Sequence, residues 1–259
     1  MNDDTKPNSN AGIERMMEIL SALEQAPHGL SQAQIVGQTG LARSTAYRIL
    51  NSLDRHGILR ESSPGTYVFG SRLLQLAEKV TPSTGYYAMS RLLQPTLEQL
   101  AHHIGQTCKV SVVESGAIML IAGASPKLAH ALSYTIGEIL PAHAGASSKV
   151  LMAHLPQEER KRLLNKHSAP LTERTIVDRR EFEAELEQAR IQGWAEDRGE
   201  YSLNVSAFAA PIRNPAGTVI AALSVPFLTT DDETLRLRLR KATIEGADEL
   251  KSTIEKLTF

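Results

Sequence analysis

The stretch from Leu41 to His56 constrains the fold most, because its apolar residues recur with the spacing of one helix face. That face would hold four apolar side chains: Ala46, Ile49, Leu50 and Leu53. The other faces carry polar and basic side chains that gather toward the N-terminal half: Arg43, Ser44, Thr45, Tyr47, Arg48 and Asn51. An ordinary amphipathic helix would leave this polar face in solvent, whereas a recognition helix would place it in the DNA major groove. The neighbouring segments favour the second interpretation.

The segments on either side of this helix follow a defined order. Residues 12–25 and 31–39 have helical patterns, Ser31 and Gln34 have the spacing of a capping box, and Gly40 supplies a tight turn. Short β-prone runs over residues 58–61 and 66–69 flank Pro64-Gly65, which is typical of a type II turn. Three helices followed by a hairpin predict a winged helix-turn-helix. The wing tip would contact the DNA backbone or minor groove through Ser63, Gly65 and Thr66.

Composition limits the classes of protein that the chain can represent. With 259 residues, 42% hydrophobic and 22% charged, the chain can form one large globular domain or two of ordinary size. A net charge of −1 argues against non-specific coating of nucleic acid, although residues 43–60 hold four arginines and one aspartate. A single cysteine, Cys108, excludes an intrachain disulfide and cysteine-rich metal motifs. The acidic N-terminus and the absence of apolar runs near the ~20 residues of a membrane span predict a cytoplasmic protein without membrane contact.

The pattern of elements predicts two domains of different class. We expect a disordered tail over residues 1–11, a DNA-binding domain over 12–70, a linker helix and break over 71–85, and a second domain over 86–259. Helical patterns in the second domain cover residues 86–104, 145–154, 179–192 and 231–257, and Pro156 with Glu158 and Glu159 is typical of a further helix start. Strand-like runs cover residues 107–113, 117–122, 129–135, 194–198, 205–213 and 218–227. Hairpins flanked by helices predict an α+β fold around a mainly antiparallel sheet.

The sequence lacks the motifs of the common catalytic and metal sites. G-x-S-x-G does not occur, residues 144–149 lack the second glycine of a phosphate loop, and the histidines show no ligand spacing. We therefore expect no catalytic residue, no cofactor and no metal. Residues 140–149 place small side chains at a predicted helix N-terminus, which would suit a carboxylate ligand, although tight helix–sheet packing explains them equally well. Ser224 lies in an apolar strand and needs a hydrogen-bond partner.

Several segments resemble the IclR family of bacterial transcriptional regulators. In the first domain the resemblance is carried by RMMEILSAL, then LSQAQIVGQTGLARSTAYRILNSLDRHGILRESSPGTYVFGSRLLQLA. In the second it is carried by LPAHAGASSKVLMA, by AEDRGEY after Gly193-Trp194, and by AFAAPIRNPAGTVIAALSV. The resemblance implies a GAF-like α/β effector-binding domain, a homodimer or dimer of dimers, double-stranded operator DNA, and a small organic acid or aromatic catabolite as effector. By position, it implies effector contacts from Leu132, Ala146, Ser147, Asp197, Ala207 and Ser224.

Two positions depart from the family pattern. Ala207 stands where relatives can carry Cys, and Pro226 where they can carry Ser, so both lack a polar group. We therefore expect a larger, partly apolar effector, such as an aromatic acid, in place of a two- or three-carbon keto acid. Four arginines are too few for one subunit to bind DNA tightly, so a dimer is also expected on energetic grounds. The alternatives are an enzyme or sensor whose helix-turn-helix serves protein contacts, and a zinc-dependent variant whose histidines converge in space.

Overall fold

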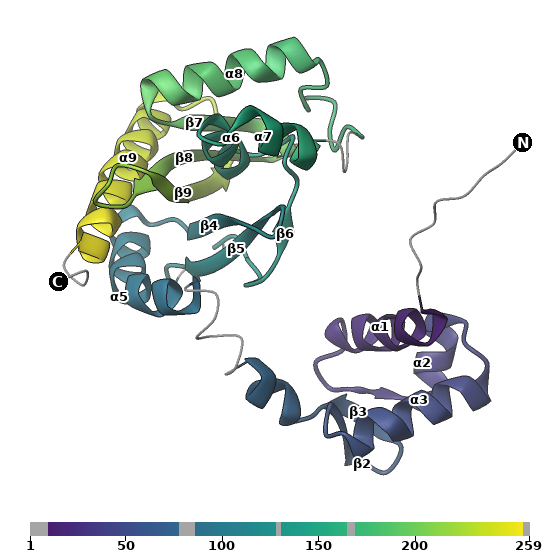
Figure 1. The fold of residues 1–259 in the computed structure, drawn as a ribbon. Coiled ribbons are helices and arrows are strands. Elements are labelled where there is room, and N and C mark those ends of the chain that lie inside the picture. Colours follow the sequence, from purple (N-terminus) through teal and green to yellow (C-terminus); the bar gives the residue numbers. More distant parts are fainter. Residues whose placement is uncertain (1–9, 78–85, 128–130, 165–168, 256–259) are drawn as a thin grey trace, which may run out of the picture. The chain divides into compact units, whose positions relative to one another are not determined.

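The computed structural model describes residues 10–77, 86–127, 131–164 and 169–255. The chain divides into two compact units, unit 1 up to Thr84 and unit 2 from Gly85 (Figure 1). The predicted break over residues 81–85 and the tail over residues 1–9 lie outside the described residues. In the described ranges, no helix combines the length and the hydropathy that crossing a membrane requires.

Three helices form most of unit 1: α1 (Ala11–Glu24), α2 (Gln32–Thr39) and α3 (Arg43–Arg55). The side chain of Asn10 caps α1 by accepting the N–H of Gly12 at 2.9 Å. Ala11 therefore belongs to α1, and its assignment to a disordered tail is wrong. The predicted capping box of Ser31 and Gln34 opens α2. Gly40 ends α2 with φ 69°, a left-handed conformation that glycine adopts without steric cost.

The apolar faces of these helices meet in a single core. Ala46, Leu50 and Leu53 form the buried stripe of α3, as the periodicity predicts, and Ile49 is half-buried beside them. Burying one such aliphatic side chain contributes about 1.5–3 kcal/mol. The buried members of the core are Ile19, Leu23, Leu30, Ile35, Leu50, Leu53, Leu59 and Tyr67. This packing leaves the opposite face of α3 in solvent.

A three-stranded antiparallel sheet completes unit 1, in the order β1-β3-β2. It consists of β1 (Leu30–Ser31), β2 (Leu59–Ser63) and β3 (Thr66–Phe69). Pro64 and Gly65 connect β2 to β3, and Gly65 has φ 76°, the value that the third position of a type II turn requires. The wing is therefore present as predicted. β1 was not predicted from the sequence, because a two-residue strand is too short to show a periodic pattern.

Unit 2 is built on a six-stranded antiparallel sheet in the order β6-β5-β4-β9-β8-β7, which confirms the predicted fold class. Its strands are β4 (Cys108–Glu114), β5 (Ala117–Ala124), β6 (Ile139–Leu140), β7 (Ala195–Ser202), β8 (Val205–Arg213) and β9 (Val219–Leu228). The strand expected over residues 129–135 is wrong where it is described, since residues 131–135 form no strand. Side chains hold this segment instead: Thr107 Oγ1 donates to the carbonyl of Leu132 at 2.7 Å, and Tyr134 lies against Gly123.

Helices cover both faces of the sheet (Figure 1). α5 (Tyr86–Ile104) and α9 (Glu233–Glu255) pack on one face, while α6 (Ala146–Ala153), α7 (Gln157–Leu164) and α8 (Arg179–Gln192) lie on the other. The strands alternate accordingly, as period-2 geometry requires. Phe208, Leu223 and Val225 face α5 and α9, whereas the small residues Ala209 and Ala222 face α6.

Candidate DNA-binding surface and effector site

The exposed side of α3 carries the side chains that the sequence singled out. Arg43, Ser44, Tyr47 and Arg48 are exposed, and Thr45 and Asn51 are half-buried. The Tyr47 side chain is 53% exposed although it is aromatic. Ala42 precedes the helix and provides no side-chain cap, in contrast to the capping residues of α1, α2 and α8. Uncapped N–H groups at the positive end of a helix favour a phosphate oxygen.

The basic side chains of this unit are not neutralised by acidic neighbours. All side-chain ion pairs of the described residues lie in unit 2. The guanidinium groups around α3 and β2 are therefore unpaired within the described structure; they belong to Arg43, Arg48, Arg55 and Arg60. This surface keeps a positive charge although the whole chain carries a net charge of −1.

The wing places its predicted contact residues at the end of a hairpin. Ser63 and Gly65 are exposed, and Thr66 is half-buried. Ser62 Oγ donates to the carbonyl of Thr66 at 3.4 Å across the hairpin. Gly70 N–H donates to the carbonyl of Ile58 at 2.8 Å and closes the base of the wing. The hairpin thus follows α3 directly, in the arrangement that winged helices use to contact DNA at two places.

In unit 2, the face of the sheet toward α6 gathers most of the predicted effector residues. The strand register pairs Asp197 with Ala207 and Ala207 with Pro226. Paired residues on neighbouring antiparallel strands point to the same face. Ser224 lies two residues before Pro226 on β9, so its side chain points to the same face. Ala146 and Ser147 approach from the first turn of α6, which packs on β7, β8 and β9.

The remaining predicted residue, Leu132, lies in the segment that crosses β5. Its carbonyl accepts the hydrogen bond from Thr107, and its side chain is half-buried. Two residues later, Tyr134 packs on Gly123, where a Cβ atom would come within 2.4 Å of the ring. Gly123 is paired with Lys109 on β4, so this segment covers the same face of the sheet.

Lys109 and Ser111 were missed by the sequence analysis, although both are polar residues in an apolar strand. Lys109 is paired with Ser224 in the sheet and is half-buried, and its ammonium group has no hydrogen bond or ion pair with a described residue. Burial lowers its pKa, and the charge of Glu138 partly opposes that shift. Ser111 Oγ is buried without a partner. No hydrogen bond joins the hydroxyl of Ser147, on α6, or that of Ser224, on β9, to another described residue. Lys109 and these three serines make up a candidate effector site.

Asp197 lies on β7, next to the start of α6. Its Oδ1 accepts the N–H of Glu200 at 2.7 Å, which fixes the bend of β7. Burial raises its pKa, while the N–H of Glu200 and the charge of Lys149 oppose the shift. Gly145, the N-cap of α6, has φ 94° and would place a Cβ 4.0 Å from Asp197 Oδ2. The carboxylate thus accepts a hydrogen bond from the backbone, which gives Asp197 a structural role beside α6.

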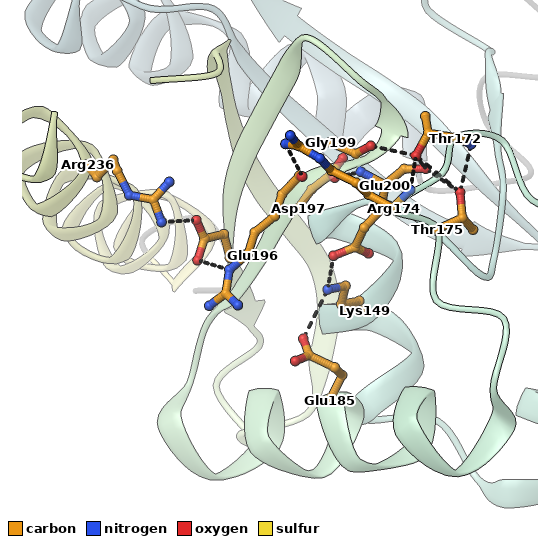
Figure 2. Close-up of polar contacts among 11 residues, drawn as sticks. Lys149, Thr172, Arg174, Thr175, Glu185, Glu196, Asp197, Gly199, Glu200 and Arg236 are labelled. Carbon is orange, nitrogen blue, oxygen red and sulfur yellow. Dashed lines mark hydrogen bonds and ion pairs between the residues drawn. The ribbon is translucent and has the colours of Figure 1, made fainter. Parts of the chain in front are cut away.

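A buried ion-pair network connects α6 to its surroundings (Figure 2). Lys149 is 1% exposed, and its Nζ donates to Glu200 Oε1 at 2.6 Å and to Glu185 Oε2 at 3.0 Å. Thr175 Oγ1 donates to the carbonyl of Glu200 at 2.7 Å, and Thr172 Oγ1 donates to that of Gly199 at 2.7 Å. One helix turn after the effector site, α6 is thus fixed to α8 and β7. Removing one partner of such a network costs about 3–5 kcal/mol.

Two histidines of the described chain make side-chain contacts, and these contacts lie apart from each other. His143 Nε2 lies 3.0 Å from the carbonyl of Ala169, and His154 contacts Val150 and Arg213. Among the described residues, no group of three or more His, Cys, Asp or Glu side chains is placed to hold a metal ion. The zinc-dependent alternative therefore has no geometric support there.

A winged helix with an unpaired basic face, followed by a sheet domain with unsatisfied polar groups under a helix N-terminus, defines the class of ligand-responsive DNA-binding regulators. Residues 86–251 match the bacterial transcriptional regulator IclR C-terminal domain, and residues 12–63 match the IclR helix-turn-helix domain. The chain belongs to the IclR family of bacterial transcriptional regulators. It is a DNA-binding transcriptional regulator with an effector-binding domain.

Individual relatives match over most of their length. An HTH-type transcriptional regulator of Mycobacterium tuberculosis is 32% identical over 224 residues, which cover 86% of this chain and 84% of that protein. The Pca operon regulatory protein of Acinetobacter baylyi is 28% identical over 255 residues, which cover 94% of this chain and 89% of that protein. The structure of an IclR homologue from Microbacterium hydrocarbonoxydans complexed with 4-hydroxybenzoate has a TM-score of 0.74 at 24% identity, covering 94% of this chain and 99% of that one. These relatives are named as regulators, which points away from an enzyme.

Proposed function

We propose that this regulator controls a catabolic operon and that its effector is a small aromatic acid bound on the α6 side of the sheet. The observation that carries the proposal is Lys109, a half-buried cation without a partner among the described residues. A buried charge is costly unless it is paired, so an anionic ligand would relieve it. The unpartnered hydroxyls of Ser111, Ser147 and Ser224 would accept or donate hydrogen bonds to the oxygens of the same ligand.

The apolar part of the site supports an aromatic body for that ligand. Ala207 and Pro226 are paired in register and offer no polar atom from their side chains. Ala209 and Ala222 extend this apolar surface on the same face. Ligand sites of this kind combine an apolar wall with a few convergent polar groups. The IclR homologue bound to 4-hydroxybenzoate and the Pca operon regulator are relatives whose names are consistent with this choice.

For DNA, we infer that two copies of unit 1 read an operator with repeated half-sites in the cytoplasm. Base and phosphate contacts would come from α3 through Arg43, Ser44, Thr45, Tyr47, Arg48 and Asn51, and from the wing through Ser63, Gly65 and Thr66. We propose a homodimer or a dimer of dimers, because one copy presents few cations for phosphate contacts. Footprinting upstream of the chain's own gene and its neighbours would identify the operator.

Calorimetric titration of the full chain with 4-hydroxybenzoate, benzoate, glyoxylate and pyruvate tests the ligand class. We expect the aromatic acids to bind in preference to the keto acids, and preferential binding of glyoxylate or pyruvate would contradict the proposal. Lys109→Met should weaken the affinity for the aromatic acids by about 10- to 100-fold, which is the effect of losing one hydrogen bond to a charged group. Lys241→Met, at a 77% exposed side chain on α9, is the matched control and should leave the affinity unchanged.

A further inference from the structure

A second cluster of cations lies in unit 2, away from the residues of the effector site. It surrounds a hollow of about 540 Å³ at the C-terminal end of α6, where α7, α8 and the end of β8 meet. The lining residues are Ala153, His154, Leu155, Pro156, Arg160, Arg190 and Arg213. Three of these seven residues are arginines, and no carboxylate is among the described residues that line the hollow. The effector-site residues lie at the opposite end of α6 and on the sheet beneath it.

Two of the three arginines are paired with carboxylates that stand outside this lining. Arg160 Nη2 lies 3.4 Å from Glu183 Oε2, and Arg190 Nη2 lies 2.6 Å from Glu187 Oε1. The Nε of Arg160 is buried and has no hydrogen-bond acceptor in the described structure. The guanidinium of Arg160 is thus only partly satisfied, since its single ion pair with Glu183 is long at 3.4 Å.

Arg213 is the cation without a carboxylate partner. Its Nη1 donates to the carbonyl of Gly217 at 3.0 Å, and its Nη2 lies 3.1 Å from His154 Nε2. The other imidazole nitrogen of His154, Nδ1, lies 2.9 Å from the carbonyl of Val150, to which it must donate. His154 Nε2 is therefore the unprotonated acceptor of the Arg213 N–H. A guanidinium held against a neutral imidazole keeps its full charge at the hollow.

The pKa of His154 reflects the positive charge around the hollow. Burial lowers its pKa, the hydrogen bond to Val150 opposes that shift, and the charges of Arg213 and Arg190 lower the pKa further. These shifts favour the neutral imidazole, which is the form that accepts the hydrogen bond from Arg213. Since Arg213 has no carboxylate partner among the described residues, an anion that enters the hollow would offset its charge.

We propose that this hollow binds a small phosphate-bearing metabolite, as a second ligand site of the regulator. Three guanidinium groups offer several N–H donors in the fork geometry that matches the oxygens of a phosphate. Leu155 and Pro156 provide an apolar wall for a short carbon skeleton, and a volume of about 540 Å³ admits such a molecule. A doubly charged phosphate would balance the unpaired charge of Arg213, and the partial charges of the two paired arginines, better than a single carboxylate would.

Calorimetric titration of the full chain with inorganic phosphate and with glycerol phosphate, at constant ionic strength, tests the proposal. We expect saturable binding of at least one of them with a Kd of about 1 mM or tighter. Arg213→Gln should weaken this binding at least about tenfold. Arg190→Gln, at a side chain that is 55% exposed, is a second variant and should also weaken phosphate binding. Arg238→Gln removes one exposed positive charge from α9 and should leave phosphate binding unchanged.

Glycerol phosphate binding more tightly than inorganic phosphate would assign the apolar wall to the carbon skeleton. Equal phosphate affinity of wild type and Arg213→Gln would overturn the proposal. So would a change in oligomeric state of Arg213→Gln with unchanged phosphate affinity, since the hollow would then be a contact between copies of the chain.

Discussion

Arg43 and Arg48 carry the most specific expectation at the scale of single residues. Both are exposed at the N-terminal half of α3, and neither has an ion pair with a described residue. A bidentate arginine–guanine contact contributes about 1–3 kcal/mol of discrimination. We expect Arg48→Ala, and likewise Arg43→Ala, to abolish specific operator binding while the affinity for the effector is retained. Gel-shift titration with operator and scrambled DNA, together with calorimetry of the effector, would measure both effects.

Arg55 provides the matched control for these variants. It is exposed on the same helix and is equally unpaired within the described chain, but it lies in the last turn of α3. Arg55→Ala removes the same charge from the surface, so it should weaken specific and non-specific DNA binding to a similar, small extent. If Arg55→Ala and Arg48→Ala lost the same discrimination, α3 would contribute only charge and the assignment of its N-terminal half would be wrong.

Glu200 carries a pH-dependent expectation at the same scale. Burial raises its pKa above the ordinary value of 4.5, with the charge of Lys149 opposing the shift. Between these two pKa values the folded chain binds a proton that the unfolded chain releases, so the contribution of Glu200 to the free energy of unfolding falls as pH rises. Glu200→Gln removes this contribution. Denaturant unfolding from pH 4.5 to about 7 should show a more positive slope against pH in the variant than in wild type.

The comparison rests on the slope, because Glu200→Gln also removes a partner of the buried Lys149 and lowers stability at neutral pH. Glu249→Gln, at an exposed position of α9, is the control and should leave the slope as in wild type. An unchanged slope in Glu200→Gln would show that the carboxyl titrates alike in the folded and unfolded chains.

At the scale of elements, local signals in the sequence predicted what depends on a few neighbouring residues. The stripe of α3, the capping box of Ser31 and the Pro64-Gly65 turn each follow from spacing or backbone preference, and all three are present. β1 and β6 have two residues each, and only the partner strand creates them. The segment 131–135 has strand-like composition, yet the side chains of Thr107 and Tyr134 hold it off the sheet.

The effector site shows the same division between local and long-range information. Resemblance supplied positions on β7, β8, β9 and α6, and the register brings Asp197, Ala207 and Ser224 onto the same face. Lys109 could have been noticed as a charge within an apolar strand, but only its pairing with Ser224 connects it to the other residues. The Lys149 network joins residues that are far apart in the sequence, so no spacing could reveal it.

Gly29 lies close to the backbone of β3, so a substitution there measures how strongly the wing depends on this close contact. It has φ 84°, and a Cβ there would lie 2.5 Å from the carbonyl oxygen of Tyr67 and 2.6 Å from Val68 Cγ1. Gly29→Ala should therefore lower the free energy of unfolding by at least about 1–3 kcal/mol. Gly37 in α2 is the control, since a Cβ there would meet nothing within 4 Å. Gly37→Ala should stabilise the helix by about 0.5–1 kcal/mol.

Denaturant or thermal unfolding of the two glycine variants would separate these effects. Both variants add the same methyl group to unit 1, so opposite signs are expected from the same chemical change. A stabilising Gly29→Ala would mean that the chain avoids the contact with β3 at little cost, and that the wing tolerates displacement.

At the scale of the whole molecule, the number of unpaired arginines predicts how operator binding responds to salt. Each copy offers four such groups around α3 and β2: Arg43, Arg48, Arg55 and Arg60. The logarithm of the binding constant falls with the logarithm of salt concentration by about 0.9 per phosphate neutralised. If two copies bind, the full operator should show a slope about twice that of a half-site. Fluorescence anisotropy across a range of salt concentrations would measure both, and equal slopes would contradict binding as a dimer.

The shortest strand of unit 1 has a consequence for regulation. Ser31 is paired with Thr66 of the wing and caps α2, while Gln32 Nε2 donates to the carbonyl of Arg43 at the start of α3 at 3.3 Å. The recognition helix and the wing are thereby joined into one rigid element. In the proposed dimer, we expect a ligand acting from unit 2 to alter the separation of two such elements and to leave the base preference of each unchanged. Induction would then depend on the spacing between operator half-sites, whereas a base change inside a half-site would weaken the ligand-free and ligand-bound states equally.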